Sequence, residues 1–262
     1  MFSTVEMAPR DPILGLNEQF NADTNPNKVN LGVGVYFDDT GKLPLLKCVQ
    51  SAEATMAAAP KPRGYLPIDG IVAYDAGVKA LVFGADSEPV KSGRVATVQA
   101  IGGTGGLKIG ADFLKKLNPN AKVLISDPSW ENHQALFTNA GFKVETYRYY
   151  DAATRGLNVD GMLADLKAAP AGTIALLHAC CHNPTGYDIT AAQWDQVVAI
   201  CKNNDLVPFL DMAYQGFGYG LKEDGAVIQK FVDAGLTFFV STSFSKSFSL
   251  YGERVGALSV LC

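Results

Sequence analysis

The 262-residue sequence predicts an α/β fold, in which a mostly parallel seven-stranded sheet carries helices on both faces in a three-layer αβα arrangement. Two observations predict it. From about residue 70, short apolar runs alternate with longer amphipathic segments, and glycine-rich or polar sequences follow most of the apolar runs directly. Because ligands of such sheets bind at the carboxyl ends of the strands, the residues that follow each run are the first candidates for function.

The elements are expected in the following order. Residues 1–45 are rich in Pro, Asn, Asp and Gly, which predicts an irregular arm with turns rather than a packed element. The expected strands are 95–100, 122–126, 142–146, 174–178, 206–210, 237–241 and 256–261. The expected helices between them are 105–117, 129–140, 158–168, 190–204 and 224–234. Thr190 is expected to cap the fourth of these helices.

The composition excludes several classes to which the protein could belong. The chain is 48% hydrophobic and 18% charged with a formal charge of −4, which argues against a nucleic-acid binder because such a protein needs a basic surface. No apolar run approaches the roughly 20 residues that span a bilayer, and the N-terminus does not resemble a signal peptide. The cysteines form no CxxC pair, which indicates reduced thiols in a cytoplasmic protein and no metal site; they are Cys48, Cys180, Cys181, Cys201 and Cys262.

A glycine-rich sequence, GGTGG, lies between an expected strand and an expected helix. Free backbone N–H groups at a helix start suit a phosphate, and Gly102, Gly103 and Thr104 would let the backbone approach it. A plain strand-to-helix turn is an equal alternative. A dinucleotide site is the lesser one, because the GxGxxG spacing and its later acidic residue are missing.

Asp211 ends a buried apolar strand, and Tyr214 follows three residues later. A carboxylate in that place needs a partner, because an unpaired buried charge is costly, and a protonated pyridine nitrogen would be a fitting one. The alternative is an aspartate that caps a helix.

Two further strand ends carry aromatic or amide side chains. HACCHNPTG exposes Asn183 in a turn, and SDPSWENH offers Trp130 as a flat surface with His133 one turn later. The ordinary alternatives are an Asn-Pro turn, a buried tryptophan and a core histidine whose nitrogens are hydrogen-bonded.

The last strand end, STSFSKSFSLYGERVG, surrounds Lys246 with serines and places Arg254 eight residues later. Ser243, Ser245 and the guanidinium of Arg254 suit a phosphate dianion, and a desolvated lysine amine can form a Schiff base. The strand ends together suit a ligand that has a phosphate, a flat ring, a ring nitrogen that pairs with an anion, and an aldehyde. Pyridoxal 5′-phosphate has all four.

These motifs also carry a family resemblance. In their order along the chain they are NLGVGVYFDDTG, YLPIDG, GGTGG, DPSWENH, HNPTG, DMAYQGF and SFSKSFSLYGERVG. With them the chain resembles the class I, fold-type I pyridoxal-phosphate-dependent aminotransferases, and among these the aspartate and aromatic-amino-acid aminotransferases. The resemblance implies that residues 46–262 form the cofactor-binding large domain, and that residues 1–45 form the N-terminal arm and part of a small domain.

The resemblance also implies the roles of individual residues. Lys246 would hold the cofactor covalently and shuttle a proton, Asp211 would pair with the pyridinium nitrogen, and His133 would support Asp211. Trp130 would stack on the ring and contribute to catalysis and to substrate binding.

Other roles concern the periphery of the cofactor. Asn183 and Tyr214 would hydrogen-bond the phenolate oxygen. The phosphate would lie among Gly102, Gly103, Thr104, Ser243, Ser245 and Arg254. Tyr65 would reach the phosphate of a neighbouring subunit, while Gly34 and Asn183 would contact the substrate carboxylate.

The implied function is a cytoplasmic, homodimeric transaminase that moves an amino group between aspartate or an aromatic amino acid and 2-oxoglutarate, with no nucleic-acid or membrane partner. The alternatives are a pyridoxal-phosphate lyase that catalyses β-elimination, a cofactor-binding module without turnover, and, last, a nucleotide-binding domain. The arginines that bind substrate carboxylates in this family are expected beyond Cys262. We therefore expect these residues to be the first part of a longer transaminase that binds the cofactor poorly by itself.

Overall fold

The computed structural model describes residues 2–7, 14–30, 32 and 34–262. The chain divides into two compact units, Met1–Leu45 and Leu46–Cys262. The expectation of an irregular arm is wrong for part of the first unit, which contains the short helix η1 (Phe2–Thr4) and the helix α1 (Leu14–Ala22). The ammonium of Lys28 donates to the backbone oxygens of Phe20 and Asp23 at 2.5 and 2.6 Å, which ties the following turn to the end of α1.

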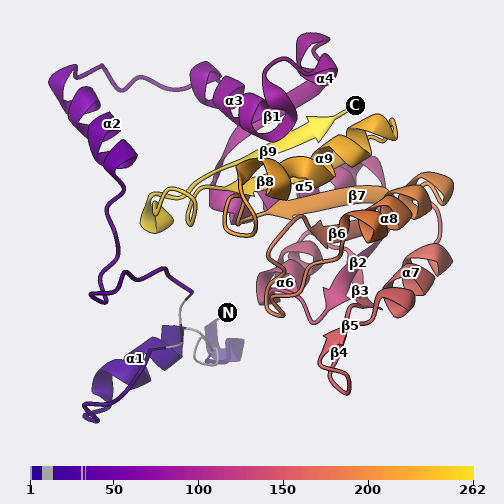
Figure 1. Ribbon diagram of the computed structural model, residues 1–262, viewed down its shortest axis with the longest axis horizontal. Coiled ribbons are helices and arrows are strands. Elements are labelled where there is room, and N and C mark those ends of the chain that lie inside the picture. Colours follow the sequence, from indigo (N-terminus) through magenta and orange to yellow (C-terminus); the bar gives the residue numbers. More distant parts are fainter. Residues whose placement is uncertain (1, 8–13, 31, 33) are drawn as a thin grey trace. The chain divides into compact units, whose positions relative to one another are not determined.

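The second unit is built on a seven-stranded sheet in the order β1-β9-β8-β7-β6-β2-β3 (Figure 1). All seven expected strands are present: β1 (Val95–Ile101), β2 (Lys122–Asp127), β3 (Lys143–Arg148), β6 (Ile174–His178), β7 (Val207–Met212), β8 (Phe238–Ser243) and β9 (Val255–Leu261). The pairs among β3, β2, β6, β7 and β8 are parallel, whereas β9 runs antiparallel to both β8 and β1. The mostly parallel α/β architecture is confirmed.

The five expected helices are also present, each shifted by three residues or fewer at its ends: α5 (Gly102–Leu117), α6 (Glu131–Asn139), α7 (Val159–Ala168), α8 (Ala191–Asn203) and α9 (Leu221–Asp233). Thr190 caps α8 as expected. Its hydroxyl accepts from the backbone N–H of Gln193 at 3.3 Å, and the Gln193 side chain accepts from the N–H of Thr190 at 2.7 Å.

Several short elements were not expected from the sequence: α2 (Lys47–Ala58), α3 (Val72–Lys79), the π-helical η2 (Ala80–Gly84), α4 (Glu88–Lys91), the hairpin β4 (Tyr150–Asp151) and β5 (Gly156–Leu157), and the 3₁₀ turn η3 (Tyr251–Glu253). None of the residues of α2 is buried. Since the apolar periodicity of a helix reflects the face that it buries, a helix that buries nothing gives little signal.

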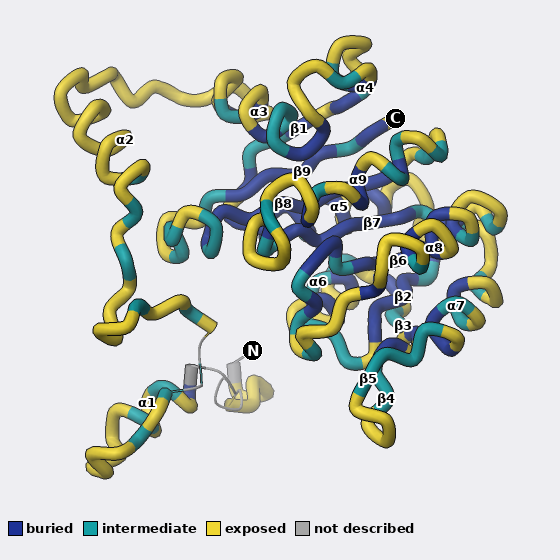
Figure 2. Tube along the Cα trace, in the orientation of Figure 1, coloured by how far each residue is buried: buried dark blue, intermediate teal, exposed yellow. Residues whose placement is uncertain are grey.

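Two hydrophobic layers sandwich the sheet, whose inner strands β2, β6, β7, β8 and β9 are buried along most of their length (Figure 2). Neighbouring residues of one strand face opposite layers, as strand geometry requires: Phe209 packs with Leu107 of α5 and Phe137 of α6, whereas Leu210 belongs to the other layer, with Val197 of α8 and α9. Each face of the sheet is therefore covered by helices, which confirms the three-layer αβα arrangement. In the described part of the chain, no helix is both long and apolar enough to cross a membrane.

The register of the sheet decides which polar residues meet. His178 at the end of β6 pairs with Asp211 of β7, and Asp211 pairs in turn with Ser241 of β8. At the same edge, Ser243 of β8 pairs with Gly256 of β9. The expected site residues thus start from adjacent strand ends.

Candidate active site

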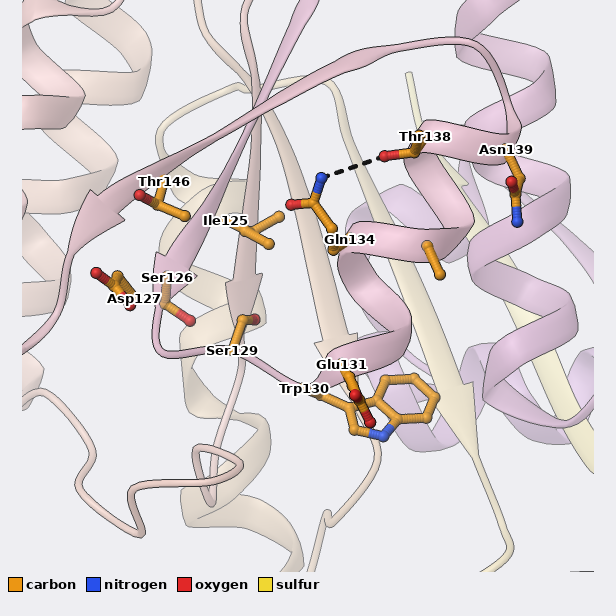
Figure 3. A pocket seen from close by; sticks show the side chains of 11 residues that line it. Ile125, Ser126, Asp127, Ser129, Trp130, Glu131, Gln134, Thr138, Asn139 and Thr146 are labelled. Atoms are coloured by element: carbon orange, nitrogen blue, oxygen red, sulfur yellow. Dashed lines mark hydrogen bonds between the residues drawn. The ribbon is translucent and has the colours of Figure 1, made fainter. Parts of the chain in front are cut away.

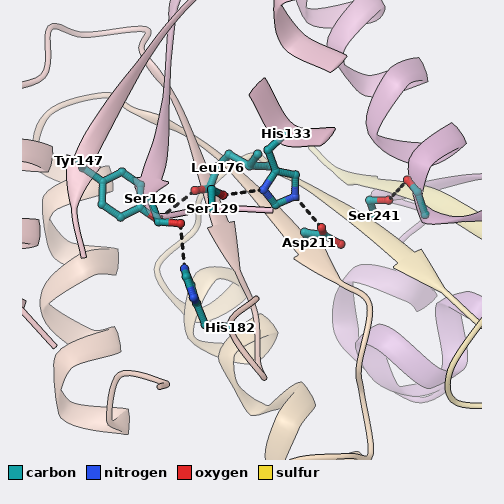
Figure 4. Close-up of polar contacts among 9 residues, drawn as sticks. Ser126, Ser129, His133, Tyr147, Leu176, His182, Asp211 and Ser241 are labelled. Carbon is teal, nitrogen blue, oxygen red and sulfur yellow. Dashed lines mark hydrogen bonds and ion pairs between the residues drawn. The ribbon is translucent and has the colours of Figure 1, made fainter. Parts of the chain in front are cut away.

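Asp211 lies at the centre of the strand edge and is held by a histidine from α6. Nε2 of His133 is 2.8 Å from Oδ2 of Asp211, and Nδ1 of His133 is 2.9 Å from Oγ of Ser129 (Figure 4). His133 is fully buried and Asp211 is 5% exposed. Among the described residues, the Asp211 side chain makes this one hydrogen bond, so Oδ1 remains available to a ligand. The alternative that Asp211 caps a helix is wrong, because the residue lies within β7.

The three histidines of the chain form one column, here called the histidine cluster (His133, His178 and His182). Their neighbouring ring centroids are 4.8 and 4.2 Å apart, and His182 also stacks on Tyr149 at 3.9 Å. Burial holds the pKa of His178 well below its ordinary value and lowers that of His182 to about 4, with neighbouring imidazoles adding to both effects. His178 and His182 are therefore neutral near pH 7.

Lys246 lies in the turn after β8, half-buried, with Nζ 4.8 Å from the centroid of the Tyr214 ring. Burial lowers the pKa of Lys246; Asp211 opposes this shift by attraction, and Arg254 adds to it by repulsion. Lys246 thus lies within electrostatic reach of both residues. A lowered pKa increases the fraction of the neutral amine, which is the nucleophilic form.

Tyr214 and Asn183 face each other across the same edge. Burial raises the pKa of the Tyr214 hydroxyl, the negative charge of Asp211 adds to the increase, and a hydrogen bond with the Asn183 side chain opposes it. The phenol is therefore protonated at neutral pH and can donate a hydrogen bond to an anionic oxygen.

A group of residues at the start of α5 and after β8 forms what we call the anion cradle: Gly102, Gly103, Ser243, Ser245 and Arg254. A Cβ on Gly102 would lie 2.6 Å from Nη2 of Arg254, and one on Gly103 would lie 3.0 Å from Cβ of Ser243. Gly102 also has a φ of +73°, which a residue with a side chain adopts only with strain. Both positions thus require glycine, because the backbone there lies too close to the side chains of Arg254 and Ser243 to carry a Cβ. An ordinary strand-to-helix turn has no such requirement.

Arg254 closes the anion cradle. Nη1 donates to Oγ of Ser245 at 3.4 Å and to the backbone oxygen of Tyr251 at 2.9 Å. In the described part of the chain, both guanidinium hydrogen bonds come from Nη1, which leaves Nε and Nη2 to an anion. The start of α5 adds backbone N–H groups and the positive end of the helix dipole. Thr104 lies half-buried in that first turn.

Trp130 precedes α6 and meets His133 edge-on, with ring centroids 5.3 Å apart. It also borders a groove of about 420 Å³ between β2, β3 and α6 (Figure 3). Neither Asp211 nor Lys246 lines this groove. The groove is therefore a neighbour of the candidate site and not the space in which Lys246 would react.

Two predicted site residues have roles that no contact in the structure tests. Tyr65 is fully exposed in the segment between α2 and α3. Gly34 is exposed in the first compact unit, whereas the site belongs to the second. Their assigned roles stay predictions.

The sequence did not reveal the residues that support the site from behind. Ser129 bonds His133, and His182 is held between Ser126 and Thr185 at 2.8 Å each. His178 ends β6 next to Asp211 in register, and its buried Nε2 has no hydrogen-bond partner among the described residues. Its place at the end of an expected strand was the available signal.

Comparison with known proteins gives the class of protein that this fold and site define. The model of the family "Aminotransferase class I and II" matches residues 26–262. The chain belongs to this family.

Individual relatives narrow the comparison. Over 261 residues the chain is 64% identical to the aspartate aminotransferase of Pseudomonas aeruginosa, and over 263 residues it is 52% identical to the aromatic-amino-acid aminotransferase of Escherichia coli. Both alignments cover 100% of this chain and 66% of the relative, so the chain spans slightly less than two thirds of their length.

Solved structures agree with the fold. The aromatic-amino-acid aminotransferase of Burkholderia pseudomallei, described as covalently bound to pyridoxal phosphate, is 65% identical and superposes with a TM-score of 0.97. The alignment covers 100% of this chain and 65% of that one. The aspartate aminotransferase of Saccharomyces cerevisiae cytoplasm superposes with a TM-score of 0.95 at 36% identity. The fold is that of the fold-type I aminotransferases.

Proposed function

We propose that this chain carries the pyridoxal-phosphate site of a transaminase that moves an amino group between aspartate or an aromatic amino acid and 2-oxoglutarate. One observation carries the proposal. A half-buried lysine of lowered pKa lies at the strand edge between a carboxylate fixed by a buried histidine and a guanidinium with donors to spare.

The residues present fit pyridoxal 5′-phosphate. The anion cradle offers the Arg254 guanidinium, serine hydroxyls and the helix start to a phosphate dianion, and the glycines remove the side chains that would fill that space. Asp211 offers its unused Oδ1 to a protonated ring nitrogen. When bound, the cofactor supplies an aldehyde for the amino group and a ring that accepts the electron pair of the broken Cα–H bond.

Lys246 performs two tasks in this proposal. Its neutral amine, favoured by burial and by Arg254, would hold the cofactor covalently through Nζ. With the cofactor and a substrate amine bound, Nζ would be the group that takes and returns a proton at the substrate Cα. A general base of lowered pKa suits this transfer.

Asp211 keeps the ring nitrogen protonated by pairing with it. The 2.8 Å hydrogen bond between His133 and Asp211 fixes the carboxylate, and the neutral His178 and His182 add no positive charge behind it. Asn183 and the protonated hydroxyl of Tyr214 hydrogen-bond the phenolate oxygen of the ring, and Trp130 supplies an aromatic face for stacking.

The substrates and partners follow from the relatives. The named relatives act on aspartate or on aromatic amino acids, and both kinds match the whole of this chain. We propose a cytoplasmic homodimer in which Tyr65 reaches the phosphate held by the other subunit, and in which Gly34 and Asn183 lie against the substrate carboxylate. The free thiols of all five cysteines are in keeping with the cytoplasm.

The test is a titration of the purified chain with pyridoxal 5′-phosphate, followed by borohydride and peptide mapping. We expect a visible absorbance that disappears on reduction, with the label on Lys246. No chromophore and no label would refute the cofactor site. For the reaction, a 2-oxo acid formed without ammonia supports transamination, whereas ammonia or pyruvate from a substituted alanine would show elimination.

A further inference from the structure

Two adjacent cysteines lie beside the candidate site and have no part in it. Cys180 and Cys181 follow β6, and Asp224 lies in the first turn of α9. The two Sγ atoms and a carboxylate oxygen all lie within 4.8 Å of one another. We propose that Cys180, Cys181 and Asp224 form a binding site for a thiophilic divalent cation, Zn²⁺ or Cd²⁺.

The distances are close to those of a metal-bound set. In a tetrahedral site with Zn–S bonds of about 2.3 Å, the two sulfurs are about 3.8 Å apart. Ligand atoms that already lie within 4.8 Å of one another have to approach by about 1 Å at most. Three protein ligands leave the fourth position to water, as in zinc sites that keep an open position.

Asp224 retains one acceptor site for the metal. Its Oδ2 accepts from the N–H groups of Gly216 and Gly218 at 2.8 and 3.0 Å, and Oδ1 accepts from Tyr219 at 2.9 Å. A carboxylate offers about four lone-pair positions. The remaining one is on Oδ1, and these three hydrogen bonds hold the carboxylate in place, as bonds around a metal ligand do.

The segment that carries the thiols is also held in place. The carboxylate of Asp188 accepts from the N–H groups of Cys181 and His182 at 2.7 and 2.8 Å. Cys180 is 6% exposed and Cys181 is half-buried, so solvent reaches the pair through Cys181. A cation therefore meets ligands whose backbone is already ordered.

Binding is an exchange of protons for the metal and involves no oxidation. Burial raises the pKa of both thiols, so each is protonated at neutral pH. Two S–H bonds break, two metal–sulfur bonds and one metal–oxygen bond form, and two protons pass to solvent. The complex with two thiolates, one carboxylate and a dication has a net charge of −1.

The bound metal would join two segments that carry residues of the candidate site. Asn183 follows Cys181 by two positions, and Tyr214 lies within electrostatic reach of Cys181. A cation on the pair and Asp224 would tie the turn after β6 to the segment after β7. The inference does not depend on pyridoxal phosphate, and its test uses the chain without that cofactor.

The experiment titrates the reduced chain with Cd²⁺ alone and follows the thiolate-to-metal absorbance in the ultraviolet. We expect one Cd²⁺ per chain. Alkylation followed by peptide mass spectrometry then compares Cys181 with Cys48, an exposed cysteine on α2 that serves as control within the same molecule. At a free Cd²⁺ concentration ten times the Kd, the alkylation of Cys181 should slow by about tenfold, and that of Cys48 should not change.

Two variants complete the test. Cys181→Ser removes one sulfur with little change of size, and the affinity for Cd²⁺ should fall by more than the roughly 10–100-fold that follows loss of an outer-shell partner. Cys48→Ser should bind as the parent chain does. An unchanged affinity in Cys181→Ser, no saturation at one ion per chain, or equal protection of Cys48 would each overturn the proposal.

Discussion

The two sides of the candidate site are built on different principles. On one side, which we call the buried side, Asp211, His133 and His182 are buried, and Asp211 is hydrogen-bonded to His133. On the other side, Lys246 is half-buried and Arg254 exposed, and their two positive charges repel each other. On the buried side Asp211 already has a hydrogen-bond partner within the protein, whereas on the other side, which we call the anion side, the proposed function pairs the positive charges with a phosphate. Substitutions should therefore cost stability and function together on the first side, and ligand affinity mainly on the second.

The largest effect is expected from Lys246→Ala. In the proposed site it removes the covalent attachment and the proton carrier, so turnover should fall by at least about 10⁴-fold, beyond the usual range of general acid–base catalysis. Borohydride should leave no label, while the anion cradle still binds the phosphate. Lys230→Ala, which removes a lysine on α9 that pairs with Asp195, is the control. Labelling at another lysine at the parental rate would contradict the assignment.

Asp211→Ala tests the buried side. It leaves a nitrogen of the fully buried His133 without its partner, and an unsatisfied buried group costs about 1–3 kcal/mol. Denaturant titration should show this loss of unfolding free energy, and cofactor binding should weaken as well. Asp195→Ala, at a side chain that is 63% exposed, should change stability by no more than about 0.5 kcal/mol. Equal stabilities of the two variants would remove the distinction between the sides.

Arg254→Ala tests the anion side. A charge-assisted hydrogen bond is worth about 1.5–3 kcal/mol, so the Kd for pyridoxal phosphate should rise by about 10–150-fold. The unfolding free energy should change little, because the side chain is exposed. Arg148→Ala, which removes an exposed arginine paired with Asp165 at the end of β3, should leave the Kd unchanged. A loss of stability without a loss of affinity would place Arg254 in a structural role.

Gly102→Ala should perturb the anion side through the backbone. A φ of +73° costs an L-residue about 1–2 kcal/mol, and the new Cβ would lie 2.6 Å from Nη2 of Arg254. Both stability and affinity for the cofactor should fall. Gly252→Ala, in the turn next to Arg254, has no atom within 4 Å of the new Cβ and no positive φ, and both quantities should remain as in the parent. Similar losses of stability and affinity in the two variants would show that the effect of Gly102→Ala is not specific to the contact with Arg254.

The sequence predicted the sheet, and it indicated candidate residues at the strand ends, because both follow from local patterns. Each strand is a short apolar run, and Asp211, Asn183, Lys246 and Gly102 each follow or end one, so parallel topology brings them to one edge. The sequence did not reveal α2, which buries nothing, or α1. Nor did it reveal that His178 and His182 complete a column behind His133. Their stacking depends on strand register, which no local pattern encodes.

The smallest expected effect is the pH dependence of stability that Lys246 causes. Its pKa is lowered from 10.5 in the folded chain, chiefly by burial, whereas in the unfolded chain it returns to that ordinary value. Between the two values the unfolded state binds more protons, so the contribution of Lys246 to the unfolding free energy rises with pH. Below the lowered pKa the cost of burying the charge is present in full, and it disappears as the pH approaches 10.5.

Lys246→Met makes this effect measurable, since it keeps the side-chain length and removes the charge. The variant should be more stable than the parent at pH 7, and the difference should shrink as the pH rises, because other groups titrate alike in both chains. Chemical denaturation of both chains without cofactor, at several pH values from 7 to 10, gives the difference directly. A difference that stays constant over this range would mean that Lys246 keeps its ordinary pKa. Burial and the charge of Arg254 would then not destabilise the charged form of Lys246. The distinction between the buried side and the anion side would lose its support at Lys246.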